Sequence, residues 1–248
     1  MPCIYKQRSD VQQIELWEKD GSIFLCLNGE IQFHSSLWRE HNNAVARRST
    51  LLCVKRDTAR VFGGGTGLST RLLLEMGFSK IDVFELDQAV VNLARTHPAL
   101  LALNGDSFSD PRVSVHIADM LSMTDERLTE PVDMIANDAT IFSSDDTGKR
   151  GVTLKQYEAA ILRDIRASQV MSLRFDDIEL AIWAPCASAL RRLLTVFLKT
   201  HAPNKHAYCW TTRRKYLGVE ETLVIYDATF EDCEKQFLIN GAPPEKLR

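Results

Sequence analysis

The residues with the clearest capacity for chemistry lie between an apolar segment and a helical pattern. Residues 61–73 read VFGGGTGLSTRLL, with Gly63, Gly65 and Gly67 at alternate positions. Glycine lets the main chain approach a ligand closely, so such a turn places backbone N–H groups and a helix N-terminus against a bound molecule. The pattern predicts a nucleotide cradle, although tight strand-to-helix turns use the same glycines.

Acidic residues stand at the ends of the strand-like segments that follow. Glu85 closes the strand in VFELD about twenty residues after the glycines, where a carboxylate accepts hydrogen bonds from ribose hydroxyls. Asp119 holds the equivalent place in HIADML. Since the carboxyl ends of parallel strands share one sheet edge, the glycines and both acids converge there. The alternative is that Glu85 and Asp119 cap helices or are solvated.

A further acid, Asp138, ends the segment VDMIANDAT. An acid that emerges from the sheet beside a bound nucleotide is placed as a general base, or as the acceptor that orients a nucleophile. Its alternative role is to begin a helix or an Asx turn in the loop.

The elements that must position these residues alternate between strand and helix. The pattern predicts strands at residues 59–62, 80–85, 113–117 and 132–137, and helices at residues 69–76 and 88–95. Strands alternating with helices form βαβ units, so we expect an α/β fold built on a parallel sheet. Later segments predict strands at 178–185, 206–213 and 221–227, the last two as an antiparallel pair, and a helix at 187–200.

The first fifty residues precede this pattern. Residues 12–33 alternate apolar and polar positions around two turn signals, KDG and NG, which is typical of a β-meander. Residues 36–54 predict a connecting helix. We therefore expect a small β-rich segment with a connecting helix at 1–50 and a Rossmann-like ligand-binding domain at 51–248.

The composition excludes several functional classes. The 248 residues are 45% hydrophobic and 25% charged, as in ordinary globular proteins, and the net charge of −3 gives no basic footprint for nucleic acid. No window approaches the length of a membrane span, and the N-terminus lacks an apolar signal region. The six cysteines are widely spaced and no His/Cys spacing suits a metal, so we expect a cytoplasmic protein without a metal site.

Together these motifs resemble the spermidine synthase (aminopropyltransferase) branch of the class I S-adenosylmethionine-dependent methyltransferase superfamily, over residues 12–158. LCLNGEIQ resembles the family's L-x-L-D-G-x-x-Q, which sets Gln32 at the glutamine that contacts the donor. In the same order along the chain, GGGTGLSTR resembles GGGDGG-x-x-R, ELD resembles EID, DPRVSVHIAD resembles DPRV-x-x-x-x-x-D, and TLKQYE resembles T-x-x-FYE.

This resemblance implies a Rossmann-like class I methyltransferase sheet with helices on both faces, preceded by the small meander, and it suggests a homodimer. It also implies a donor-binding set, which is Gln32, Gly63, Gly65, Thr66, Gly67, Glu85 and Asp119. It also implies that the acceptor is a small molecule and that the residues around it are Trp38, His41, Thr140 and Ile141. A helix that carries SLWREH can equally well pack its tryptophan in the core.

Two departures from the family pattern bear on the donor and the acceptor. Thr66 stands where the polyamine enzymes have an acid. The segment DATIF aligns with the family motif D-S-S-D-P, so Asp138 matches the first aspartate of that motif and Ile141 replaces the second. Those enzymes use decarboxylated S-adenosylmethionine, whose arm carries an ammonium but no carboxylate. Two like charges about 4 Å apart cost about 4 kcal/mol at an effective dielectric of about 20, and about 1 kcal/mol in water, so an aspartate repels the intact donor. Threonine removes that repulsion and offers a hydroxyl donor.

We therefore expect a transferase that uses intact S-adenosylmethionine and moves a methyl or a 3-amino-3-carboxypropyl group to a small non-polyamine nucleophile, with Asp138 as base or orienting acid. Two alternatives stay open. One is a polyamine aminopropyltransferase that uses decarboxylated S-adenosylmethionine, and the other is a non-catalytic descendant that keeps the nucleotide site. The sequence does not identify the acceptor.

Overall fold

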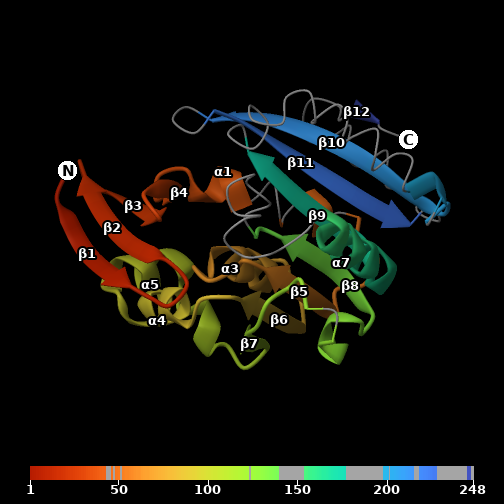
Figure 1. Cartoon of the computed structure of the whole chain (residues 1–248), viewed down its shortest axis with the longest axis horizontal. Helices are drawn as coiled ribbons and strands as arrows, with labels where there is room; N and C mark the ends of the chain where they lie inside the picture. The colour runs from red at the N-terminus through yellow and green to blue at the C-terminus, as the bar shows by residue number, and fades with distance from the viewer. Residues whose placement is uncertain are drawn as a thin grey trace.

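The computed structural model describes residues 1–42, 46, 48–50, 52–122, 124–139, 154–176, 198–200, 202–214, 218–227 and 245–246. These residues form two β-sheets, with helices packed against the second (Figure 1). Among the helices of this part of the chain, none combines the length and the apolarity that crossing a membrane requires.

The N-terminal sheet is an antiparallel meander. Its strands pair in chain order: β1 (Cys3–Arg8), β2 (Gln13–Lys19), β3 (Ser22–Leu27) and β4 (Glu30–His34). The turns fall at KDG and NG, where residues 20, 21, 28 and 29 have φ values between 51° and 84°. Positive φ at both central residues gives a two-residue hairpin the twist of its strands. The predicted meander is confirmed, and β1 extends it.

The second sheet has the order β12-β10-β11-β9-β8-β5-β6-β7. Its parallel part comprises β5 (Thr58–Phe62), β6 (Lys80–Glu85), β7 (Val113–Ile117), β8 (Val132–Asn137) and β9 (Ser168–Asp176). Its antiparallel part comprises β10 (Lys205–Arg214), β11 (Gly218–Asp227) and β12 (Glu245–Lys246). The four predicted parallel strands and the antiparallel pair are confirmed.

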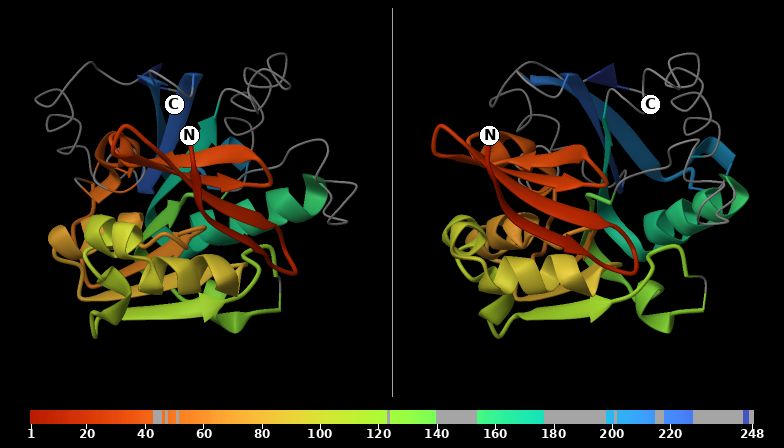
Figure 2. Two further views of the ribbon diagram at one scale, coloured as in Figure 1. Left: turned by 90° about the vertical axis from the view of Figure 1, so that its left-hand side faces the viewer. Right: turned by 60° about the vertical axis from the view of Figure 1, so that its left-hand side comes forward.

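Helices cover both faces of the parallel strands, as expected (Figures 1 and 2). α3 (Leu68–Glu75), α4 (Gln88–Thr96) and α5 (Pro98–Asn104) lie between this sheet and the N-terminal sheet, and α7 (Leu154–Ala167) lies on the opposite face. The short helical segments are α1 (Trp38–Asn42), α2 (Arg48–Thr50), η2 (Ser107–Ser109) and η3 (Glu126–Leu128). The predicted Rossmann-like fold is therefore confirmed.

Neighbouring residues of one strand serve two separate cores, because successive side chains point to opposite faces of a sheet. Val61 is 0% exposed and belongs to the core that contains α3, α4 and the inner face of the N-terminal sheet. Phe62, the next residue, is also 0% exposed and packs with Ile161 and Ile165 of α7. The face that carries Phe62 also holds Arg60, which is 2% exposed and donates hydrogen bonds to carbonyls within η3 and just after it.

One expectation about a helix needs correction, and one strand was missed. The helix predicted at 36–54 is confirmed in part, because the described residues 38–42, 46 and 48–50 are helical, whereas Leu52 and Cys53 lie beyond α2. Their N–H groups bond three residues back, at 3.1 and 3.2 Å, which closes a turn. β9 was missed because it follows α7 at once, with no glycine or proline to separate them. The predicted strand at 178–185 and most of the helix at 187–200 lie outside the described residues, and the domain division at residue 50 stays a prediction.

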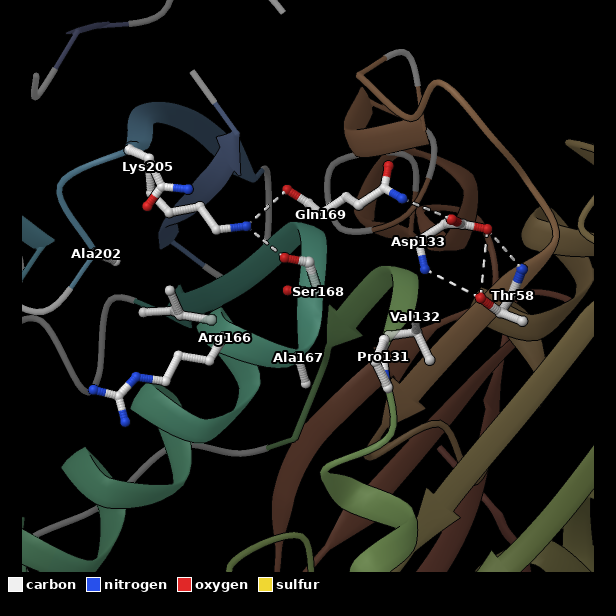
Figure 3. Close-up of a pocket in the computed structure, with 12 residues that line it drawn as sticks. Thr58, Pro131, Val132, Asp133, Arg166, Ala167, Ser168, Gln169, Ala202 and Lys205 are labelled. Carbon is white, nitrogen blue, oxygen red and sulfur yellow. Dashed lines mark hydrogen bonds between the residues drawn. The ribbon is translucent and has the colours of Figure 1, made fainter. Parts of the chain in front are cut away.

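A buried carboxylate ties together the amino ends of three parallel strands (Figure 3). Asp133 of β8 is 6% exposed, and its Oδ2 accepts hydrogen bonds from the N–H groups of Asp57 and Thr58, both at 2.9 Å. Its Oδ1 accepts one from Gln169 Nε2 at 3.0 Å. A cavity of about 440 Å³ lies beside this network, at the sheet edge opposite the predicted nucleotide cradle.

Removing this carboxylate tests the network. We expect Asp133→Ala to lower the free energy of unfolding by about 2–4 kcal/mol, because two partly buried N–H groups and the Gln169 side chain lose their acceptor. Asp57→Ala is the matched control, since Asp57 is exposed and joins the network through its backbone N–H. Urea denaturation of both variants measures the difference, and equal midpoints would show that the network adds nothing to stability.

Candidate active site

The carboxyl ends of β5, β6 and β8 meet where the glycine loop lies. β5 and β8 are neighbours, but the chain continues from β5 to β6 on one side and from β8 to β9 on the other. Open α/β sheets bind ligands in the crevice at such a divergence. Backbone bonds join the strand ends here, since Gly63 N–H donates to Phe84 O at 3.0 Å and Asp138 N–H donates to Phe62 O at 2.9 Å. The structure brings the glycine loop, Glu85 and Asp138 to one place.

The glycines of this loop are needed for the protein's own packing. A Cβ on Gly63 would lie 2.4 Å from the Cα of Ala139, and one on Gly65 would lie 2.6 Å from Glu85 Oε2. Gly67, which precedes α3, has a φ of 76°, in the left-handed region that favours glycine. Gly63 therefore allows the close approach of the chain after β8, and Gly65 allows the Glu85 carboxylate to lie against the loop.

Glu85 turns its carboxylate toward the glycine loop. Its Oε2 accepts a hydrogen bond from Gly65 N–H at 2.9 Å, and its Oε1 accepts one from Asp87 N–H at 3.1 Å. Burial raises the pKa of the Glu85 carboxyl above its usual range, although the neighbouring backbone N–H groups favour the ionised form. This carboxylate has the position expected of an acceptor for ribose hydroxyls.

Asp87 is a structural residue of the site that the sequence did not single out. It is 3% exposed and caps α4, with Oδ1 accepting from Ala89 N–H at 2.9 Å. Its Oδ2 accepts from Ser9 Oγ at 2.7 Å and from Gln12 Nε2 at 3.0 Å, both in the N-terminal segment. An acid directly before a helical pattern is the signal that could have identified the cap. Asp87 holds the N-terminal segment beside Glu85.

Asp138 follows β8 at the crevice and is partly buried. Its Oδ2 lies 3.4 Å from the Oγ of Ser69, at the start of α3. Ser69 Oγ donates to Asn42 Oδ1 at 2.5 Å, and Asn42 Nδ2 donates to Trp38 O at 2.8 Å. Ser69 thus lies between the candidate base and α1, and its single hydroxyl hydrogen can serve only one of the two acceptors at a time. A carboxylate in this position can accept a proton or a hydrogen bond from a nucleophile.

Trp38 is placed in the core. Its side chain is 7% exposed and belongs to the cluster formed with α3 and the N-terminal sheet. Two guanidinium groups lie over its ring, with the Cζ atoms of Arg39 and Arg71 at 4.4 and 5.4 Å from the ring centroid. This burial favours the packing alternative, and a contact of Trp38 with an acceptor stays a prediction.

Thr66 lies in the middle of the glycine loop and is partly buried. Its carbonyl accepts a hydrogen bond from Asn104 Nδ2 at 3.0 Å, and the same nitrogen donates to Ala94 O at 3.0 Å. Asn104 is 1% exposed. The loop is therefore held at residue 66 through the main chain, so the side chain at this position can change without loss of that bond.

The remaining predicted site residues are more dispersed. Gln32 is partly buried on β4. Asp119 is exposed after β7, where its Oδ1 accepts from Leu121 N–H at 2.9 Å and caps its own turn. No group of His, Cys, Asp and Glu side chains suited to a metal ion occurs in the part of the chain that the structure describes. Three predicted acceptor contacts lie outside the described residues: the side chain of His41, Thr140 and Ile141.

The domain that carries this site matches a known family. Residues 50–164 match the model of the "Spermine/spermidine synthase domain". "Polyamine aminopropyltransferase 2" of Bacillus cereus is 29% identical over 117 residues, which are 47% of this chain and 32% of that protein. "Polyamine aminopropyltransferase" of Corynebacterium efficiens is 37% identical over 114 residues, which are 46% of this chain and 21% of that protein. The chain therefore matches less than a third of the length of either relative.

Solved structures extend the similarity to the fold as a whole. Spermidine synthase from Thermotoga maritima aligns with a TM-score of 0.70 at 18% identity, over 97% of this chain and 79% of its own. A spermidine synthase in complex with the transition-state analogue AdoDATO aligns with a TM-score of 0.71 at the same identity and coverage. The expected resemblance to the spermidine synthase branch is confirmed, in sequence over residues 50–164 and in fold over nearly the whole chain.

Replacing Glu85 with glutamine separates its effects on stability and on binding. Because folding raises the pKa of Glu85, its carboxyl contributes stability that is fully present below the unfolded pKa of about 4.3 and is lost as pH rises through the folded pKa. Glu85→Gln lacks this loss, so its melting temperature relative to the wild type increases from about pH 4 to about pH 8. Thermal melts at several pH values measure this, and a difference that shrinks with rising pH contradicts it.

The same variant should bind an adenosyl donor about tenfold to hundredfold more weakly, since a hydrogen bond to a charged group contributes about 1.5–3 kcal/mol. Glu75→Gln, at an exposed position on α3, is the matched control and keeps wild-type affinity. Calorimetry with an adenosyl donor measures both, and unchanged affinity of Glu85→Gln would exclude Glu85 from the donor site.

Proposed function

We propose that this chain is an aminopropyltransferase that joins a small-molecule amine to the three-carbon arm of decarboxylated S-adenosylmethionine. The proposal rests on Asp138, whose N–H bonds to Phe62 O at 2.9 Å and which therefore stands beside the glycine loop at the neighbouring strand end. The matched relatives are named polyamine aminopropyltransferases. Those names favour this alternative over the methyl or aminocarboxypropyl transfer that the sequence put first.

The proposed reaction is a displacement at the carbon bound to the sulfonium. The lone pair of the amine nitrogen forms a new N–C bond while the C–S bond breaks, and sulfur keeps the bonding pair as the neutral thioether of methylthioadenosine. The adduct then loses one proton. Asp138 is suited to orient the attacking amine through a hydrogen bond and to receive that proton. In-line placement of the two reactants supplies the remaining rate enhancement.

The donor would be held at the ends of β5, β6 and β7. The glycine loop offers backbone N–H groups and the start of α3, and Glu85 offers a carboxylate to the ribose. Asp119 and Gln32 complete the proposed donor set. An amine acceptor then approaches from the side of β8, where Asp138 lies. A homodimer and a cytoplasmic location remain proposals.

A second candidate is favoured by Thr66. In this candidate the same displacement uses intact S-adenosylmethionine and transfers the 3-amino-3-carboxypropyl arm. A hydroxyl beside the arm does not repel its carboxylate, whereas an aspartate would do so by about 1–4 kcal/mol. The two candidates share every other residue of the site and differ in the donor.

Calorimetry with both donors decides between the candidates. The proposal expects tighter binding of decarboxylated S-adenosylmethionine, and tighter binding of the intact donor would contradict it and support the second candidate. Thr66→Asp should then shift the affinity ratio toward the decarboxylated donor by about tenfold to several hundredfold. Asn104 holds the loop through the carbonyl of residue 66, so this variant keeps the fold. Thr66→Ser is the matched control and leaves the ratio unchanged.

Asp138→Asn tests the proposed base. We expect kcat with an amine acceptor to fall by about 10²- to 10⁴-fold, the usual contribution of a positioned acid or base, while donor affinity stays within about twofold. Asp10→Asn, at an exposed position in the N-terminal segment, should keep wild-type kcat. Steady-state kinetics measures both variants. Equal turnover by Asp138→Asn and the wild type would remove Asp138 from the mechanism.

A further inference from the structure

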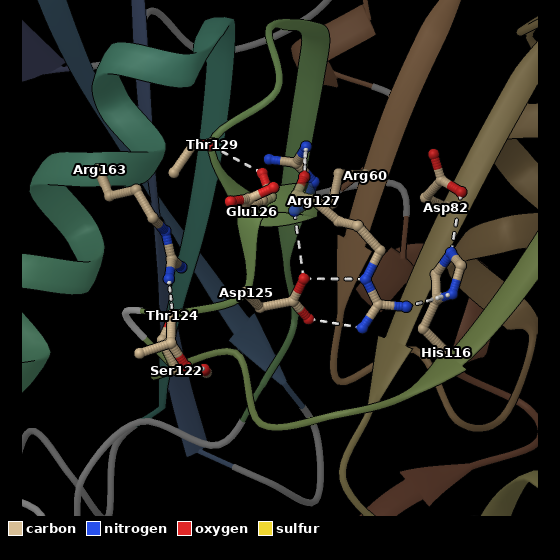
Figure 4. Close-up of polar contacts among 10 residues, drawn as sticks. All are labelled: Arg60, Asp82, His116, Ser122, Thr124, Asp125, Glu126, Arg127, Thr129 and Arg163. Atoms are coloured by element: carbon tan, nitrogen blue, oxygen red, sulfur yellow. Dashed lines mark hydrogen bonds and ion pairs between the residues drawn. The ribbon is translucent and has the colours of Figure 1, made fainter.

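A buried arginine on α7 reaches the loop that follows β7 (Figure 4). Arg163 donates from one terminal nitrogen to Ser122 O and from the other to Met120 O, both at 2.7 Å. Its side chain is only 6% exposed. The guanidinium therefore spans two carbonyls of one short loop, residues 118–122, which contains Asp119.

This loop is a short turn whose Ala118 and Met120 pack against the core that includes Ile161 and Ile165 of α7. Asp119 closes the turn on itself, since its Oδ1 accepts from Leu121 N–H at 2.9 Å and its carbonyl accepts from Ser122 N–H at 3.0 Å. At its start, Ala118 N–H donates to Glu85 O at 3.0 Å. At its end, Arg163 supplies the bonds from α7. The loop is thus held between the end of β6 and α7 as a preformed unit.

Asp164 fixes the arginine in turn. Its Oδ1 accepts from Arg163 Nε at 2.8 Å, and its side chain is 0% exposed. Desolvation raises the pKa of Asp164 to about 7, while the positive charges of Arg163 and of the buried Arg60 act in the opposite direction. Only a planar guanidinium can donate to this carboxylate from Nε and at the same time to two carbonyls from its terminal nitrogens. Neither residue belongs to a motif that is recognisable in the sequence.

We propose that Arg163 is a positioning residue for the donor: it sets the 118–122 loop so that Asp119 and Glu85 bind the adenosine from adjacent strand ends. This inference rests on the proposed function, because it takes Asp119 as part of the donor site. Asp138 lies at the end of β8, with β5 and β6 between it and β7. Arg163 therefore acts on donor binding and leaves the chemical step unchanged.

Arg163→Lys is the main test, because a lysine keeps the positive charge beside Asp164 but lacks the fork that spans two carbonyls. We expect the Kd for decarboxylated S-adenosylmethionine and for methylthioadenosine to rise about tenfold, as for the loss of one oriented hydrogen bond. The KM for the amine acceptor and kcat at saturating donor stay within about twofold of wild type. Arg166→Met, at an exposed position on the same helix, is the matched control and binds the donor as the wild type does.

A second variant keeps the test decisive if Arg163→Lys does not fold. Arg163→Met combined with Asp164→Leu removes both buried charges, a change that proteins often tolerate. It should show the same rise in the Kd of methylthioadenosine and the same unchanged acceptor KM. If Arg163→Lys and the double variant lower the melting temperature but bind both ligands as the wild type does, Arg163 is only a packing residue and the inference is overturned. If the wild type itself binds neither ligand, the proposed function has failed instead.

Discussion

The close approach of three strand ends is the constraint on which the candidate site depends. A Cβ at Gly63 would lie 2.4 Å from the Cα of Ala139, and one at Gly65 would lie 2.6 Å from the carboxylate of Glu85. The absence of a side chain at Gly63 lets the end of β5 approach the backbone that follows β8, and its absence at Gly65 leaves room for the Glu85 carboxylate. The crevice, the orientation of Glu85 and the position of Asp138 all follow from this spacing. The glycines are therefore required for the packing of the protein itself, in addition to their proposed role in ligand binding.

Buried acids at the two edges of the sheet have different environments. At the amino edge, Asp133 accepts hydrogen bonds from two backbone N–H groups and from Gln169, which suits a purely structural residue. At the carboxyl edge, burial raises the pKa of Glu85 despite its two backbone partners. A carboxylate that is incompletely compensated costs stability and gains from a ligand that donates hydrogen bonds to it. The contrast supports the proposal that a ligand binds at the carboxyl edge.

Much of the fold could be predicted from the sequence because its signals are local. β6, β7 and β8 are short segments that contain Val and Ile and lie between polar or turn residues, and the turns at KDG and NG carry their own conformational preference. β9 gave no such signal, since it follows α7 without a turn residue. For the site, the spacing of glycines and acids predicted which strand ends carry polar groups. The network of Ser9, Gln12 and Asp87 and the contacts of Arg163 could not be predicted, because each joins residues far apart in sequence.

In the proposed reaction, an amine attacks the three-carbon arm of the donor and leaves the methyl group on sulfur. The fate of an isotopic label tests it most directly. The protein is incubated with a diamine and decarboxylated S-adenosylmethionine that carries a deuterated S-methyl group, and the products are identified by mass spectrometry. The account predicts deuterium in methylthioadenosine and an unlabelled aminopropyl group on the amine. Deuterium on the amine, or the absence of both products, would contradict it.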